Sequence, residues 1–181
     1  MISDGHSQSK RPVSAVLAGP YGHPFHPIMV TVPIGAWIAS FVFDLASRIV
    51  DKPGFLTQGS EMLIAIGVVG ALAAAMLGFL DLFAIPSGTR AYRTALLHMT
   101  LNLLVTTAYG LGFWWRYGGH DDGDPVATGQ IILSAISLAG LALSGSLGGK
   151  LAYHYGVRVA DEDTQAQGFA TTSAAHDHPT H

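Results

Sequence analysis

Residues Tyr21–Val50 read YGHPFHPIMVTVPIGAWIASFVFDLASRIV. The apolar run inside this stretch, Pro27–Val50, is long enough to cross a bilayer, because about 20 helical residues span the hydrocarbon core. Pro33 stands within the run and removes one backbone hydrogen bond, which predicts a bend in the helix. His23 and His26 precede the run, and histidine is a metal ligand, a haem ligand and a proton carrier. The stretch therefore predicts a transmembrane helix with two histidines, His23 and His26, at its N-terminal end.

The composition agrees with a membrane protein. The chain has 181 residues, of which 49% are hydrophobic and 12% are charged, whereas soluble domains carry about 25% charged residues. The absence of cysteine excludes disulfides, thiolate metal sites, cysteine nucleophiles and cysteine-bound iron–sulfur clusters. The basic residues are scattered, so we expect no nucleic-acid partner. No catalytic triad order, nucleophile elbow or phosphate loop stands out, so the sequence leans away from an enzyme.

Four apolar runs are expected to span the membrane, at about residues 27–50, 61–83, 95–117 and 128–153. Short connections between spans place consecutive helices next to each other in opposite directions. The sequence thus predicts an all-α fold, an integral membrane antiparallel four-helix bundle over residues 21–159. Residues 1–20 are expected to form a polar tail, and residues 160–181 a disordered tail.

Small residues recur at helical spacing on two of the spans. On the second span they are Gly67, Ala71, Ala74 and Gly78; on the fourth they are Gly140, Ser144 and Gly148, with Gly145 and Gly149 beside them. Small residues at this spacing let helices approach closely. The stripes predict close packing, either within one bundle or between the copies of a homo-oligomer.

The distribution of lysine and arginine predicts the orientation in the membrane. One end of the bundle is expected to hold Lys10, Arg11, Arg90, Arg93, Lys150 and Arg158; the other end is expected to hold Arg48, Lys52 and Arg116. The richer end carries both termini, so we expect a multi-pass protein of the inner (plasma) membrane with both termini cytoplasmic. At the other end Asp44 and Arg48 lie one helical turn apart, which predicts an ion pair on one face.

Polar residues gather at the predicted cytoplasmic end, because each span enters or leaves the membrane there. They are His23 and His26 on span one, Asp81 and Arg90 after span two, His98 and Asn102 on span three, and His154 after span four. Ionisable groups within a membrane are costly and are functional candidates by default.

One interpretation of this cluster is structural, and a second is a cofactor site. In the structural interpretation Asp81 pairs with Arg90 or with a histidine, and the cluster only locks the helices of a membrane protein or anchor. In the second, a haem b lies between helices, with His98 as its best ligand and with His26, His23 or His154 as the partner ligand. Such a protein would be a redox subunit that exchanges electrons with a partner protein.

A third interpretation is a divalent metal site or a proton site. Its candidate ligands are His23, His26, Asp81, His98 and His154, which offer the nitrogen and oxygen atoms that zinc, copper or iron bind. A metal or proton transporter would also need a polar path to the opposite face. There the sequence offers Asp44, Arg48 and Tyr109, a thin lining that ranks transport below binding.

Four motifs in order resemble a family of bacterial four-helix membrane proteins that is classed as a domain of unknown function. They are GHPFHPIMVTVPIGAW, GFLDLFAIPSGTR, HMTLN and GGKLAYHYGV. The resemblance covers about Gly22–Val159 and implies the fold and the membrane location. In that family the bundle also occurs joined to Rieske-type iron–sulfur domains, which favours a membrane redox role, although this chain has no cysteine. The family positions carried over are His23, His26, Asp81, Arg90, His98, Asn102, Tyr153 and His154.

Overall fold

A computed structural model of the chain describes residues 9–11, 25–117, 123–167 and 169. Within those residues all regular structure is helical, and no strand occurs. The elements are α2 (Phe25–Met29), α3 (Thr31–Ser47), α4 (Gly54–Leu82), α5 (Arg90–Tyr117), α6 (Thr128–Gly149), the π-helical turn η3 (Lys150–His154) and α7 (Glu162–Gln167).

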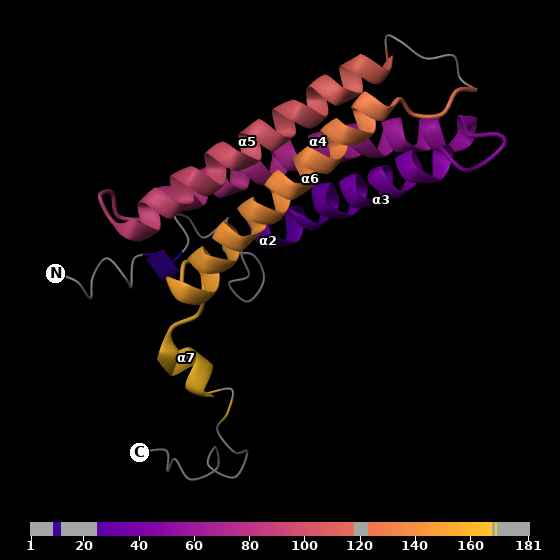
Figure 1. Cartoon of the computed structure of the whole chain (residues 1–181). Coiled ribbons are helices and arrows are strands. Elements are labelled where there is room, and N and C mark those ends of the chain that lie inside the picture. The colour runs from indigo at the N-terminus through magenta and orange to yellow at the C-terminus, as the bar shows by residue number, and fades with distance from the viewer. Residues whose placement is uncertain (1–8, 12–24, 118–122, 168, 170–181) are drawn as a thin grey trace, which may run out of the picture.

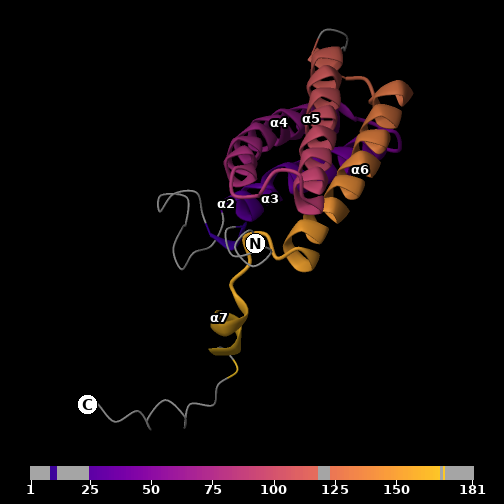
Figure 2. The same ribbon diagram turned by 90° about the vertical axis from the view of Figure 1, so that its left-hand side faces the viewer.

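The long helices form an all-α antiparallel bundle (Figure 1). In the described residues, four helical segments are long and apolar enough to cross a membrane: Phe25–Ser47, Gly54–Leu82, Arg90–Tyr117 and Thr128–His154. The predicted fold class is confirmed. The α3–α4 and α5–α6 connections lie at one end of the bundle, the loop end. The α4–α5 turn, α2 and η3 lie at the other, the histidine end. Figure 2 shows α7 beyond that end, apart from the bundle.

The first span is interrupted between α2 and α3. Helix α2 ends at Met29 and α3 begins at Thr31, four residues and two residues before Pro33. A proline ring clashes with the carbonyl four positions earlier, which here belongs to Met29. The chain continues through the interruption because Val30 N donates to His26 O at 3.1 Å and Ile34 N donates to Val30 O at 3.3 Å.

Two helices begin earlier than the hydropathy suggested. Helix α4 begins at Gly54. Most of residues 51–60, which were expected to connect the first two spans, therefore belong to the first turns of α4. Leu56 N and Thr57 N both donate to Pro53 O, at 2.8 and 3.0 Å, and start the helix. The hydropathy pattern did not indicate this start because the first turns contain polar residues. Two of them, Thr57 and Ser60, are nevertheless buried against the bundle. In the same way, α5 begins at Arg90 rather than near residue 95.

The polar segment after α6 contains a short helix within the region that was expected to form a tail. Residues 162–167 form α7, and Lys10 Nζ lies 2.9 Å from Glu162 Oε1. The remaining residues of the two expected tails lie largely outside the described residues.

The centre of the bundle is an apolar layer built on two aromatic rings. Trp37 and Tyr109 stack with centroids 4.1 Å apart and planes 10° apart. Ile64 and Val105 complete this layer, and all four residues are at most 5% exposed. The Trp37 indole N–H also donates to Ile64 O at 3.3 Å.

The small residues on α4 let large rings approach its backbone. A Cβ on Gly67 would lie 2.2 Å from Nε1 of Trp37, and a Cβ on Gly78 would lie 3.0 Å from the His26 ring. On α6, a Cβ on Gly148 would lie 3.1 Å from the His98 ring. Gly145, by contrast, has open space where its Cβ would be. These stripes therefore serve packing inside one bundle, and the Gly145 position does not.

Candidate functional site

Two histidines from distant parts of the sequence meet at the histidine end. His26 lies on α2 and His98 lies in the third turn of α5. Their ring centroids are 6.3 Å apart and their planes are nearly perpendicular, at 85°. Both side chains are half-buried. We call these two residues the histidine pair.

Backbone carbonyl groups fix both rings of the histidine pair. His26 Nδ1 lies 2.8 Å from Ala74 O, and His98 Nδ1 lies 2.8 Å from Ser144 O. A carbonyl oxygen can only accept a hydrogen bond, so each Nδ1 carries the proton and donates it. The neutral ring then has its lone pair on Nε2, which is the atom left to accept a hydrogen bond or to bind a metal.

Asn102 contacts the Nε2 atom of His98. Its Nδ2 lies 3.1 Å from His98 Nε2 and donates to His98 O at 3.0 Å. An amide nitrogen is a donor, so this contact agrees with a lone pair on Nε2. Ser144 adds its hydroxyl oxygen 3.0 Å from His98 Nδ1. The His98 ring is therefore held on both sides.

A partly buried ion pair lies at the same end of the bundle as the histidine pair. Arg158 Nε lies 3.0 Å from Asp81 Oδ1, and the two side chains are 7% and 19% exposed. Arg158 has a φ of 58°, in the left-handed region that residues other than glycine rarely adopt. Its N–H donates to Ser9 O at 3.0 Å. The π-helical turn η3 and this strained residue direct the arginine back under the bundle; both features concentrate at functional sites.

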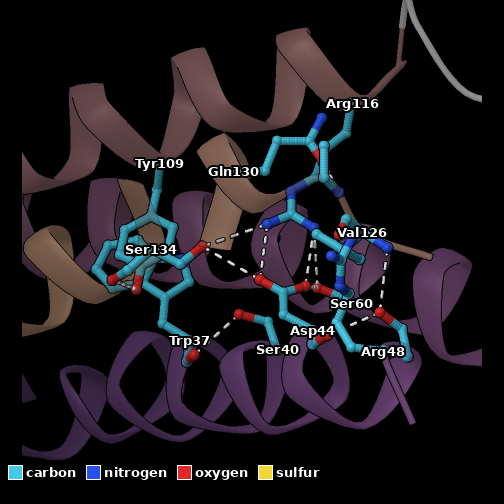
Figure 3. Close-up of polar contacts among 12 residues, drawn as sticks. Trp37, Ser40, Asp44, Arg48, Ser60, Tyr109, Arg116, Val126, Gln130 and Ser134 are labelled. Atoms are coloured by element: carbon cyan, nitrogen blue, oxygen red, sulfur yellow. Dashed lines mark hydrogen bonds and ion pairs between the residues drawn. The ribbon is translucent and has the colours of Figure 1, made fainter. Parts of the chain in front are cut away.

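A second polar cluster lies inside the loop end (Figure 3). The Arg116 guanidinium donates to the Asp44 carboxylate through two parallel bonds, Nη1–Oδ1 at 2.8 Å and Nη2–Oδ2 at 2.7 Å. Ser60 donates to Asp44 Oδ1, and Ser134 donates to Asp44 Oδ2 at 3.3 Å. Each of the four long helices contributes one of these residues, which we call the polar core.

The polar core is sealed from the loop end by a polypeptide segment that follows α5. Val126 N donates to Ser47 Oγ at 3.1 Å, and Val126 is fully buried. Arg48 Nη1 donates to Val126 O at 3.2 Å, and Thr57 Oγ1 donates to Asp124 O at 2.9 Å. Asp44 is 0% exposed and Arg116 4% exposed as a result.

Residues 22–161 match the family described as "Predicted membrane protein (DUF2231)". The chain belongs to this family. The match contains both the histidine pair and the polar core, and the four apolar helices of the structure agree with the family description. No curated protein and no solved structure matches the chain. The resemblance to a membrane domain of unknown function is thereby confirmed.

The DUF2231 bundle brings together only part of the predicted cytoplasmic cluster. His26, His98 and Asn102 are in contact, and Asp81 lies nearby. Arg90, Tyr153 and His154 are exposed, and His23 lies outside the described residues. Among the residues that the structure describes, no group of three or more histidine, aspartate or glutamate side chains converges as metal ligands do.

Both predicted ion pairs have different partners in the structure. Asp81 pairs with Arg158 rather than with Arg90 or a histidine, because the chain after α6 turns back toward α4. Asp44 pairs with Arg116, not with Arg48, because Asp44 faces the bundle interior while Arg48 reaches the backbone of the α5–α6 connection. Arg116 was expected to be a loop charge and is instead a buried residue.

One signal in the sequence does point to the polar core. The buried residues of α6 are all polar: Gln130, Ser134, Ser137 and Ser144. In an apolar helix this spacing marks a face turned toward protein, since a lipid-facing side has no partners for hydroxyl groups. Such a face requires polar partners on the neighbouring helices, and Asp44 and Arg116 are two of them.

Proposed function

We propose that this DUF2231 protein is a membrane redox subunit that binds one haem b through His26 and His98. The observation that carries the proposal is the geometry of the histidine pair. Two imidazole rings bound to one metal ion from opposite sides have centroids about 6 Å apart, because each metal–nitrogen bond is about 2 Å long. The rings here are 6.3 Å apart.

The anchoring of the rings supports the same proposal. Histidine ligands almost always donate their other ring N–H to a carbonyl or carboxylate, which fixes the tautomer and the ring orientation. Both histidines do so, at 2.8 Å, and leave Nε2 as the ligand atom. Asn102 now donates toward that atom of His98, so its side chain has to turn away when a metal binds.

Two glycines let the histidine rings lie directly against the neighbouring helices. Gly78 and Gly148 lie against His26 and His98, and a Cβ on either would come within about 3 Å of the ring. The site lies at the end of an apolar bundle, as a haem b held between helices requires. When bound, haem supplies a one-electron centre, and the chain's own part is to fix the two rings and exclude water.

Two other functions fit this end less well. A divalent-metal site needs about four ligands, and no three candidate side chains converge within the described part of the chain. A purely structural lock explains the carbonyl anchors, but it gives no reason for two histidine rings to lie 6.3 Å apart.

The decisive experiment is an optical spectrum with haem quantification of the protein purified from membranes. We expect a Soret band, one haem per chain, and loss of both in His26→Ala and in His98→Ala. His154→Ala is the matched control, since His154 is exposed at the same end, and it should keep the spectrum. No Soret band in the unmodified protein would sink the haem proposal. A lowered melting temperature in His98→Ala, without any spectral change, would leave only the structural lock.

We also propose that both termini are cytoplasmic and that the protein lies in the inner (plasma) membrane. Arg116 is buried in an ion pair, so it no longer counts as a loop charge. Arg158 is likewise held in an ion pair, with Asp81, which leaves five basic residues at the histidine end and two, Arg48 and Lys52, at the loop end. The bias toward the histidine end therefore remains. An electron-transfer partner would then approach the histidine pair from the cytoplasm; reporter fusions at each end test this topology.

A further inference from the structure

Helices α5 and α6 lie side by side along the bundle (Figure 1). Near the loop end the ring of Trp115 lies over Gly129, because a Cβ on Gly129 would be 2.8 Å from Cη2 of Trp115. Both residues are exposed, so this contact lies on the side of the two helices that faces lipid. We call that side the outer α5–α6 seam.

On α5 the outer seam continues to the histidine end. Leu97 stands 18 positions before Trp115 and shares its face, because an α-helix has about 3.6 residues per turn. By the same geometry Arg90 lies within about 20° of that face and Arg93 within about 40°. Both arginines and Leu97 are exposed. The first turn of α5 therefore presents two guanidinium groups on the seam.

On α6 the outer seam ends in a lysine. Leu143 and Lys150 stand 14 and 21 positions after Gly129, which places them within about 40° and 60° of its face. Both are exposed. Each helix thus carries an exposed leucine on the seam and at least one basic residue nearer the histidine end.

The basic residues of the two helices lie at similar depth. His98 Nδ1 is 2.8 Å from Ser144 O, which fixes the register between α5 and α6. Arg93 lies five residues before His98, and Lys150 lies six residues after Ser144. Both are therefore about 8–9 Å closer to the histidine end than this contact, at a rise of about 1.5 Å per residue.

These positive charges have no anionic partner within the described part of the chain. The ion pairs there involve other basic residues. The contact of Lys150 Nζ with the Tyr155 ring, 5.7 Å from its centroid, brings no negative charge. Leu97 and Leu143, 58% and 63% exposed, form an apolar surface on the membrane side of the charges. The seam therefore combines uncompensated cations with an apolar surface, as a phospholipid requires.

We propose that the outer α5–α6 seam binds an anionic phospholipid whose headgroup carries two phosphate groups. Arg90 and Arg93 bind one phosphate and Lys150 binds the other, while the acyl chains lie over Leu97 and Leu143. A guanidinium group binds phosphate oxygens through two parallel hydrogen bonds, and lysine binds them as a point charge. Basic groups between spans at the membrane surface attract anionic headgroups.

A zwitterionic lipid fits the seam less well, because its headgroup would add a further positive charge beside Arg90, Arg93 and Lys150. A lipid with one phosphate reaches the arginines of α5 or the lysine of α6, whereas two phosphates engage both helices. The site does not include the histidine pair and does not depend on haem binding.

Native mass spectrometry of the protein in detergent tests the headgroup. Cardiolipin, which has two phosphates, should bind at least tenfold more tightly than phosphatidylcholine and at least threefold more tightly than phosphatidylglycerol. Lys150→Gln should weaken cardiolipin binding at least threefold, whereas Lys52→Gln, at an exposed lysine of the loop end, should not. Equal affinities for the three lipids, or equal losses in the two variants, overturn the proposal. Phosphatidylglycerol binding as tightly as cardiolipin overturns the assignment of two phosphates.

Two further measurements test the acyl chains and the place of binding. Excess inorganic phosphate should leave cardiolipin bound, and its displacement overturns the part given to the acyl chains. The chain has no native cysteine, so a fluorophore can be attached at Leu97→Cys. Its matched control is Met76→Cys on α4, 71% exposed and at a similar distance from the histidine end. In phosphatidylcholine liposomes containing a little cardiolipin with brominated chains, quenching should be at least twofold stronger at position 97. Equal quenching overturns the seam as the site.

Discussion

Asp44 and Arg116, 72 positions apart in sequence, form a bidentate ion pair in which both side chains are almost fully buried. The pair joins the end of the first span to the end of the third. Ser60 and Ser134 attach the second and fourth spans to the same carboxylate. One carboxylate therefore fixes the relative positions of all four long helices at the loop end.

Asp44→Asn should strongly destabilise the bundle. The variant leaves the Arg116 charge buried without its counter-charge, which costs about 3–5 kcal/mol in comparable cases. Thermal unfolding in detergent measures the loss. Asp51→Asn, at an exposed position nearby, is the control and should change little. The double variant Asp44→Asn/Arg116→Gln should recover part of the stability, and an unchanged melting temperature in Asp44→Asn would contradict the role of the pair.

Gly67→Ala should destabilise the protein, whereas Gly110→Ala should not. A Cβ on Gly67 would lie 2.2 Å from Trp37 Nε1, while nothing lies within 4 Å of a Cβ on Gly110. Overpacking of this kind costs about 1–3 kcal/mol, and a helical alanine at the open position gains up to about 1 kcal/mol. Melting temperatures of the two variants should move in opposite directions. A tolerated Gly67→Ala would show that Trp37 is not packed against α4 as described.

Arg158→Gly should be more stable than Arg158→Ala. Both variants lose the ion pair with Asp81, but only glycine relieves the left-handed backbone at φ 58°. The left-handed conformation costs about 1–2 kcal/mol for other residues. Comparing the two variants in the same thermal assay isolates the backbone contribution. If alanine is the more stable, residue 158 does not adopt this conformation in the membrane.

Asn102→Ala tests the surroundings of the histidine pair without removing either proposed haem ligand. The variant deletes the donor to His98 Nε2 and leaves the anchor from Ser144 O in place. Haem occupancy should stay the same or rise, because the amide no longer competes for that nitrogen. Asn102→Asp, which brings a carboxylate to the same place, should change the absorption spectrum. Complete loss of haem in Asn102→Ala would show that Asn102, rather than His98 alone, holds the cofactor site together.

The fold and the histidine pair could be predicted because both depend on patterns within single helices. Apolar runs of membrane length give the spans, and antiparallel order brings His26 and His98 to one end. The ion pairs could not be predicted in the same way. Arg116 follows two tryptophans at a helix end, where an exposed basic residue is the ordinary expectation, and its burial depends on how α5 is rotated.

The pairing of Asp81 with Arg158 was even less predictable from the neighbouring residues in the sequence. It requires the π-helical turn η3 and a left-handed residue that is not glycine. Neither conformation follows from the residue types at 150–158. Tyr153 and His154 lie in the same π-helical turn and are exposed.

The partnership of Asp44 with Arg116 has a consequence for biogenesis. The arginine emerges from the ribosome at the end of the third apolar segment, when its carboxylate partner has been in the membrane for two segments. Until the two meet, a lone aspartate sits at the end of the first helix with only the Ser60 hydroxyl to shield it. Insertion of the third helix is thus the step at which the buried Asp44 carboxylate gains its counter-charge. We therefore expect the first three helices to stay in contact during insertion until this pair has formed.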